Sequence, residues 1–415
     1  MLLRIILLCI VLMLPCVSPA MAVPMTLHEA VQRAQATHPS VAQAKLDIAR
    51  AQAQLQQFKA AILPSVAAVG QWTQLDSDRI SGGHVVLPAS QLYAAVALTV
   101  PVLVPQRWVA WRHAQDAENV AEMSVAAARW DVGVAAARLW LSLLTTQRQV
   151  EVLERAQETA KVHLGFAEQR RKGGIGNQLD IVRAAQEVAQ ADALVKAYGA
   201  LRVKLAEQLA FLTDASPPVT PVGDCPLALE ATLATDASLR PDVRAVERRI
   251  QAALRVVNDS TADWYPSVFA TVLPFAQWPA LSTVPNLGLQ AQLIVNFPIF
   301  DWGARRGLEQ ERQAIAEQLQ VQKTGLERQI AADARAARGA WMAATSALQA
   351  ARDALGWAQE GLNLAQIAWR AGASTNLEVV DAERRTRDAA TAVVVAEDAV
   401  RQAWLDASVA GGGLP

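Results

Sequence analysis

The side chains that most often bind metals or catalyse reactions are few and scattered in this sequence. The histidines His28, His38, His84, His113 and His163 do not have the spacing of metal ligands. No Ser/His/Asp or Cys/His arrangement predicts an activated nucleophile. The glycine-rich run 173–176 does not follow a buried strand, so it does not predict a nucleotide-binding loop. We therefore expect no metal site, no cofactor and no enzymatic activity.

Two acidic side chains have a more informative spacing. Glu378 and Asp381 lie three positions apart, shortly after Gly372, where a helix is expected to begin. Residues three apart share one face of a helix, so the two carboxylates point the same way. Acids in a first helical turn are also favoured by the helix dipole without any further role. These residues alone leave both interpretations open.

The first 22 residues have the features of a signal peptide. Arg4 supplies a positive charge, residues 5–14 are apolar, and Ala20-Met21-Ala22 has the small-x-small pattern of a cleavage site. An uncleaved anchor is the alternative, but the apolar run is short for a membrane span. Cys16 follows Pro15 rather than the small residue of a lipidation motif, so lipidation stays open but disfavoured. After cleavage only Cys225 remains, which rules out an internal disulfide.

The rest of the chain consists of two halves with similar sequence motifs. Four motifs recur in the same order: His38-Pro39 as Arg240-Pro241 and Leu63-Pro64 as Tyr265-Pro266, both 202 positions later, Val100-Pro101 as Phe297-Pro298 after 197, and Gly174 as Gly372 after 198. A nearly constant offset indicates an internal repeat. We predict a signal peptide at 1–22, a first repeat at 23–212, a linker at 213–238 and a second repeat at 239–415. Prolines in the linker, such as Pro217 and Pro218, prevent a helix there.

Each repeat is expected to be dominated by long helices. In the first repeat we predict helices at 26–61, 108–171 and 179–211, with two strands between the first and the second. The longest of these helices would span on the order of 95 Å. Its apolar residues alternate three and four apart, as in a left-handed coiled coil: they are Val120, Met123, Ala127, Trp130, Val134, Ala137, Leu141 and Leu144. Such a helix needs neighbours along its whole length, which predicts an extended bundle or a barrel of helices.

The predicted strands have one apolar and one polar face. Between positions 287 and 297 every second residue is apolar, and the residues between them are mostly polar or small. At about ten residues this strand has the length of a tilted transmembrane strand. Strands near 66–72, 92–100 and 268–274 complete a set of four, with a less regular alternation at 66–72 and 268–274. The aromatic residues Trp72, Tyr93 and Trp278 near strand ends suit either a lipid–water interface or ordinary packing. Four strands cannot close a barrel, and lipid does not tolerate open sheet edges, so membrane-spanning strands would require a homo-oligomer.

The run 371–382, its first-half counterpart 172–180 and both ends of the mature chain resemble the TolC-type outer-membrane efflux protein family, the outer membrane factors. The resemblance implies a mainly α fold with a β-barrel part. In this fold, duplicated strand–long helix halves form a trimeric twelve-stranded outer-membrane β-barrel. A periplasmic α-helical coiled-coil barrel continues it.

The resemblance also implies the function. It predicts a passive exit duct in the outer membrane, serving a tripartite efflux or type I secretion system. The implied partners are two further copies of the chain, a periplasmic membrane-fusion adaptor, an inner-membrane pump of the RND, ABC or MFS class, and outer-membrane lipid. The net charge of −1 offers no basic face for nucleic acid. The substrate, whether drug, metal ion, dye or protein toxin, is not specified.

By this resemblance, Glu378 and Asp381 line a closed aperture as two stacked acidic rings, which favour cations. The hairpin-tip turns, with roles in adaptor contact or gating, contain Gly174, Asp180, Arg183, Trp369, Gly372 and Ser374. The type member has a basic residue where this chain has Ser374, and a tyrosine where it has Trp369. A different latch is therefore expected, for which Arg370 and Arg183 are the candidates.

Two alternatives belong to other classes of protein. A periplasmic coiled-coil adaptor or scaffold would have one helical hairpin, whereas this chain repeats its strand–helix plan. A secreted hydrolase with helical arms would need a catalytic site, and the sequence shows none.

Overall fold

The computed structural model describes residues 23–223, 240–280 and 285–414. The predicted signal peptide, most of the predicted linker and Cys225 lie outside these residues. The chain divides into two compact units. Unit 1 comprises Met1–Ala42, Ala127–Pro241 and Glu327–Pro415, and unit 2 comprises Gln43–Ala126 and Asp242–Leu326.

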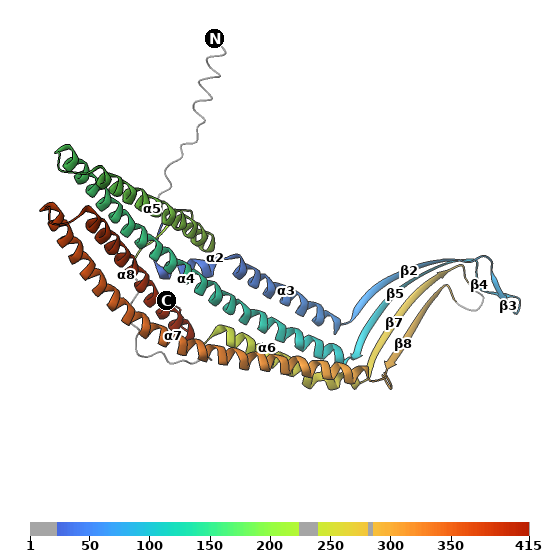
Figure 1. The fold of residues 1–415 in the computed structure, drawn as a ribbon. Coiled ribbons are helices and arrows are strands. Elements are labelled where there is room, and N and C mark those ends of the chain that lie inside the picture. The colour runs from blue at the N-terminus through green and yellow to red at the C-terminus, as the bar shows by residue number, and fades with distance from the viewer. Residues whose placement is uncertain (1–22, 224–239, 281–284, 415) are drawn as a thin grey trace, which may run out of the picture. The chain divides into compact units, whose positions relative to one another are not determined.

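Helices make up most of the chain (Figure 1), and the two longest of them have residues in both units. The helices are α2 (Leu27–Thr37), α3 (Pro39–Ala61), α4 (Pro105–Lys172), α5 (Gln178–Thr213), α6 (Pro241–Asn258), the 3-10 helix η2 (Asp259–Trp264), α7 (Ala304–Arg370) and α8 (Asn376–Ala410). The strands are β1 (Val23–Met25), β2 (Ser65–Gln74), β3 (Arg79–Ser81), β4 (His84–Leu87), β5 (Ser90–Leu103), β6 (Val219–Pro221), β7 (Ser267–Trp278) and β8 (Leu287–Asn296). The series α3, β2, β5, α4, α5 recurs as α6, β7, β8, α7, α8, which is the duplicated plan expected from the sequence. Among the described residues, no helix combines the length and the apolar character needed to cross a membrane.

The first predicted helix is wrong as a single element, because the chain breaks at His38. This residue has φ −59° and ψ 136°, which ends α2, and α3 begins at Pro39. Proline disfavours the helical conformation in the residue before it and has no N–H to donate within a helix. Thr26 begins α2 with a capping box: its hydroxyl accepts from the Glu29 amide at 3.3 Å, and the Glu29 carboxylate accepts from the Thr26 amide at 3.0 Å.

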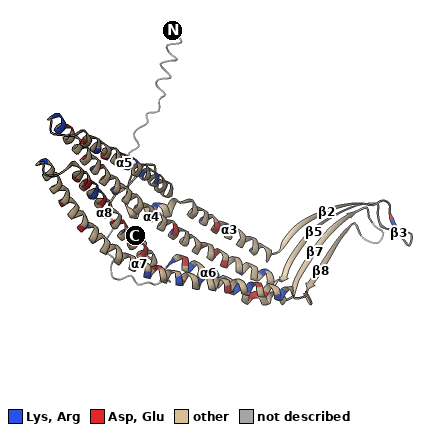
Figure 2. Cartoon of the chain, viewed as in Figure 1, with Lys and Arg blue, Asp and Glu red and all other residues tan. Residues whose placement is uncertain are grey.

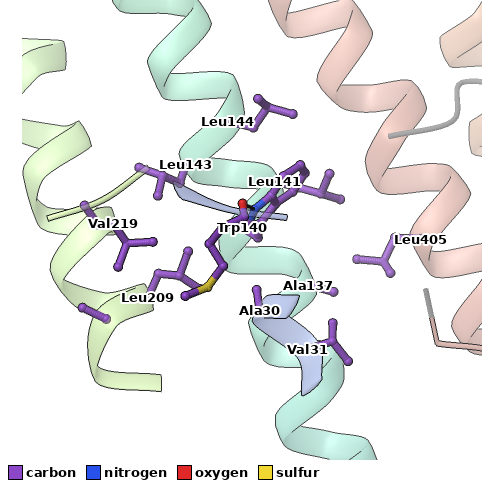
Figure 3. Packing of buried hydrophobic residues seen from close by; sticks show 13 residues of the cluster. Ala30, Val31, Ala137, Trp140, Leu141, Leu143, Leu144, Leu209, Val219 and Leu405 are labelled. Atoms are coloured by element: carbon purple, nitrogen blue, oxygen red, sulfur yellow. Dashed lines mark hydrogen bonds between the residues drawn. The ribbon is translucent and has the colours of Figure 1, made fainter. Parts of the chain in front are cut away.

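The core of unit 1 surrounds Trp140 of α4 (Figure 3). Trp140 is 1% exposed, and its indole Nε1 donates to the Met25 carbonyl at 2.9 Å. Leu141, Leu209 and Leu405, from α4, α5 and α8, belong to the same cluster. All eight residues of the predicted coiled-coil seam are buried or half-buried. β1 pairs in parallel with β6, so the predicted linker contains a short strand.

In unit 2, one antiparallel sheet has the strand order β2-β5-β7-β8. Residues that pair directly across strands lie on the same face. One face is apolar: it carries Val66, Ala68, Trp72, Leu92, Ala94, Val96, Leu98, Val272, Pro274, Ala276, Trp278, Leu287, Leu289, Ala291, Leu293 and Val295. The other face is mixed: it carries polar residues such as Gln71, Thr99 and Gln292, and apolar ones such as Val69 and Phe269. The sequence alternation therefore predicted the apolar face correctly.

The connection between β2 and β5 contains two short strands. Within it β3 and β4 form a separate two-stranded ribbon, and Gly82 and Gly83 turn between them with positive φ. Positive φ is unstrained only for glycine, so these two residues specify the turn.

Candidate functional site

Two helical hairpins of unit 1 carry the predicted site. The first hairpin consists of α4 and α5, and the second consists of α7 and α8. Gly174 (φ 79°) and Gly372 (φ 76°) occupy equivalent places in the turns that close them, and the left-handed backbone there explains both glycines. Figure 2 shows Lys and Arg gathered at both tips, and three of these basic residues end α4.

Glu378 and Asp381 lie in the first turns of α8, as predicted, and both are exposed. The Asp381 carboxylate forms an ion pair with Arg385 at 2.7 Å, one turn further along the same helix. Glu378 therefore presents the less compensated charge of the two.

The predicted latch residues differ in what they contact. The Ser374 hydroxyl reaches only the carbonyl of its neighbour Thr375, at 3.4 Å. Arg183 forms no ion pair or hydrogen bond with any described residue. The Arg370 guanidinium lies over the Phe166 ring, 5.4 Å from its centroid, and so joins the second hairpin to the first. Of these three, only Arg370 makes a contact of the kind expected of a latch.

Trp369 joins the hairpins more closely. Its side chain is buried, and its ring lies 4.9 Å from the His163 ring of α4. The Arg170 guanidinium covers the Trp369 ring at 4.8 Å, and Arg170 also donates to the Trp369 carbonyl at 2.8 Å. A cation over an aromatic face is attracted by the ring's charge distribution.

Behind the tips lies a group of buried and half-buried polar side chains, of which the sequence pointed only to Asp180. We call it the polar cluster: His163, Asp180, Glu187, Asn376, Glu383, Arg384 and Arg387. Glu187 of α5 accepts from Arg384 Nε at 2.6 Å and from Arg387 Nη1 at 2.5 Å, both on α8. Glu187 is 4% exposed, so removing its arginines would leave a buried charge without compensation.

His163 extends the polar cluster to the start of α8. Its Nε2 lies 2.6 Å from Asn376 Oδ1, and the Asn376 amide donates to the Asp180 carbonyl at 3.2 Å. Because an amide oxygen only accepts, His163 carries a proton on Nε2. Burial lowers the pKa of His163, against the opposing effects of the Asn376 hydrogen bond and the Asp180 charge. His163 is therefore neutral near pH 7, and its Nδ1 presents a lone pair.

That lone pair faces Glu383. Its Oε1 lies 3.8 Å from His163 Nδ1, and neither carboxyl oxygen has a hydrogen-bond partner among the described residues. Burial, and then the charge of Glu187, raise the pKa of Glu383 to about 7. A carboxyl group that is still about half protonated at pH 7 is unusual, because an exposed one is ionised there.

One signal in the sequence could have revealed these residues. His163 lies between the buried Ala160 and Ala167, and Glu187 lies between the buried Ala184 and Ala191, in both cases at spacings of three and four. Polar residues thus occupy positions of an apolar helical stripe. Only the structure shows that these stripes face each other.

The sequence model of the outer membrane efflux protein family matches residues 30–213 and 236–412. The chain belongs to this family. It is an outer-membrane exit duct for efflux, and its helical part lies in the periplasm.

Solved structures share the fold at low sequence identity. A membrane protein from Pseudomonas aeruginosa has a TM-score of 0.80 at 22% identity, over 93% of this chain and 90% of that one. The outer membrane protein VceC from Vibrio cholerae has a TM-score of 0.77 at 18% identity, over 93% and 96%. The open state of the Neisseria gonorrhoeae MtrE outer membrane channel has a TM-score of 0.77 at 19% identity, over 93% and 89%. No curated protein matches the sequence.

Proposed function

We propose that three copies of this chain form a channel whose second hairpins close an aperture at the periplasmic end. A periplasmic adaptor and an inner-membrane pump of the RND, ABC or MFS class supply substrate and energy, in tripartite efflux or type I secretion. The channel itself is passive, and selection of the substrate belongs to the pump.

The observation that carries the assembly is the sheet of unit 2. Leu287, Leu289 and Leu293 of the apolar face are 71%, 70% and 68% exposed within a single chain. The outer strands β2 and β8 each pair on one side only. In lipid every backbone N–H and C=O needs a partner, so these edges must pair with those of neighbouring chains. Three four-stranded sheets then supply twelve strands.

The aromatic residues of the sheet support the same placement. Trp72 and Trp278 both pair with Leu92, so the two indoles stand in one row of the apolar face. They are 68% and 47% exposed. Tryptophan is favoured at the lipid–water interface, where its ring is partly in lipid and its N–H is hydrated.

At the tips, Glu378 and Asp381 form the acidic rings of the closed aperture. The polar cluster, with Trp369 and Arg370, holds the two hairpins of each chain together. It thus takes over the latch role that Ser374 cannot fill. Asp381 contributes less negative potential than Glu378, because Arg385 compensates its charge.

Measurements of ion selectivity in planar bilayers test whether Glu378 and Asp381 line the aperture. Glu378→Gln with Asp381→Asn removes two negative charges per chain, so the preference for cations over anions falls towards unity. Glu168→Gln, an exposed carboxylate on the first hairpin, is the control and keeps the selectivity of the original chain. Unchanged selectivity in the double variant would show that neither residue lines the aperture. Absence of any conductance in the original chain would contradict the channel.

A further inference from the structure

We propose that Glu383 and His163 form a couple that shares one proton, and that this proton passes from the carboxyl to the imidazole when the two hairpins separate. The couple makes the contact between the hairpins insensitive to pH in the mildly acidic range. Its meaning for gating rests on the proposed function, whereas the couple itself does not.

The two groups lie next to each other, although they are too far apart for a direct hydrogen bond. Glu383 Oε1 faces His163 Nδ1 across 3.8 Å, and both side chains are at least nine-tenths buried. The Nε2 of His163 is committed to Asn376, so Nδ1 is the nitrogen left to receive a proton. No described residue donates a hydrogen bond to either oxygen of Glu383.

The surroundings determine where the proton resides while the hairpins are in contact. A cavity of about 190 Å³ beside Glu383 is lined by Glu187, whose charge Arg384 and Arg387 compensate. Five other charged groups lie around the couple. They line the cavities beside Glu383 or act on His163 and Trp369: Arg155, Glu158, Arg170, Asp180 and Arg370. Burial disfavours both ionised forms, which keeps Glu383 protonated up to about pH 7 and His163 neutral.

When the hairpins separate, the proton moves from Glu383 to His163. In water the carboxyl returns to its ordinary pKa of 4.5 and the imidazole to 6.5. Between these values the pair again holds one proton, now on His163. Opening therefore neither takes up nor releases a proton between about pH 5 and 6.5, and pH does not change the opening equilibrium. As pH rises through 6.5 and 7, the separated pair loses its proton before the contact does, so opening rises about threefold in total between about pH 5.5 and 8.

Each partner alone would make the contact sensitive to pH, with opposite signs. With Glu383→Gln, the separated state protonates His163 at a higher pH than the contact does, so opening rises as pH falls below about 6.5. With His163→Gln, the contact holds a proton on Glu383 that the separated state loses. Opening then rises with pH, by up to about tenfold per unit between pH 5 and 7. The two causes of the raised Glu383 pKa are burial and the charge of Glu187, and neither is the charge of His163.

The test is hydrogen exchange of the full-length protein between pH 5 and 8, read on peptides from the two tips and divided by the intrinsic exchange rate. We expect a flat profile below pH 6.5 for the original chain, opposite slopes for the two single variants, and a flat profile for the double variant. Glu360→Gln, an exposed carboxylate on α7, is the control and follows the original chain. A slope in the original chain below pH 6.5, or flat profiles in both single variants, would overturn the couple.

Bilayer recordings separate this result from the proposed function. If the exchange profiles are as expected but the Glu378 and Asp381 variants leave selectivity unchanged, the couple stands and the aperture fails. If selectivity changes as expected but the single variants show no slopes, the aperture stands and the couple fails.

Discussion

Trp140 is the largest fully buried side chain among the described residues. Its indole is enclosed by residues of α2, α4 and α5, and its N–H satisfies the Met25 carbonyl. Trp140→Ala should therefore destabilise the chain by about 3–5 kcal/mol, from lost burial and the cavity left behind. Chemical denaturation measured by circular dichroism tests this value.

Trp357 is the matched control, because it lies on a long helix but is 77% exposed in the single chain. Trp357→Ala should change stability by about 0.5 kcal/mol or less, as surface substitutions usually do. Equal losses for the two variants would show that Trp140 is not central to the core.

At this scale the sequence predicted some residues well and others not at all. The seam that contains Trp130 followed from spacing alone, because residues alternately three and four positions apart lie along one side of a helix. The partners of Glu187 could not be inferred, since Arg384 and Arg387 lie about 200 positions away on another helix. Sequence spacing describes one helix, and a contact between helices also depends on their rotation and offset.

The strands of unit 2 permit a sharp test at the scale of the element. Leu293 and Gln292 are neighbours on β8, both exposed in the single chain, and they lie on opposite faces of the sheet. If the apolar face meets lipid, Leu293→Arg should cost about 2–4 kcal/mol near the middle of the membrane. Gln292→Arg should insert normally, because the other face would line the channel. The amount of each variant recovered in the outer membrane measures the difference.

The same pair of variants also tests the orientation of the strands. If Gln292→Arg blocks insertion and Leu293→Arg does not, the faces are reversed. If both insert equally, the sheet does not meet lipid at this depth.

The elements themselves were largely predictable from the sequence. Alternation with period two predicted β5 and β8, and the long apolar seam predicted α4 with ends within three residues. The break at His38 was missed because the helical pattern of α2 continues in α3, although Pro39 marks a boundary. The β3–β4 ribbon was missed because its strands are too short to show a period.

Among the described residues of one chain, the sheet has two edges and an apolar face without partners, which supports the proposed oligomer. We predict that the protein fractionates with the outer membrane. On gels it should migrate as a trimer when unheated and, after boiling, as a monomer of 44.6 kDa less the mass of the predicted signal peptide. The reason is that inter-strand hydrogen bonds around a closed barrel persist in detergent until heat separates the strands. A soluble periplasmic monomer would contradict the channel and favour the adaptor alternative. Leu293→Arg serves as the comparison, since a chain that cannot insert should lose the trimer band while α4 and α7 still fold.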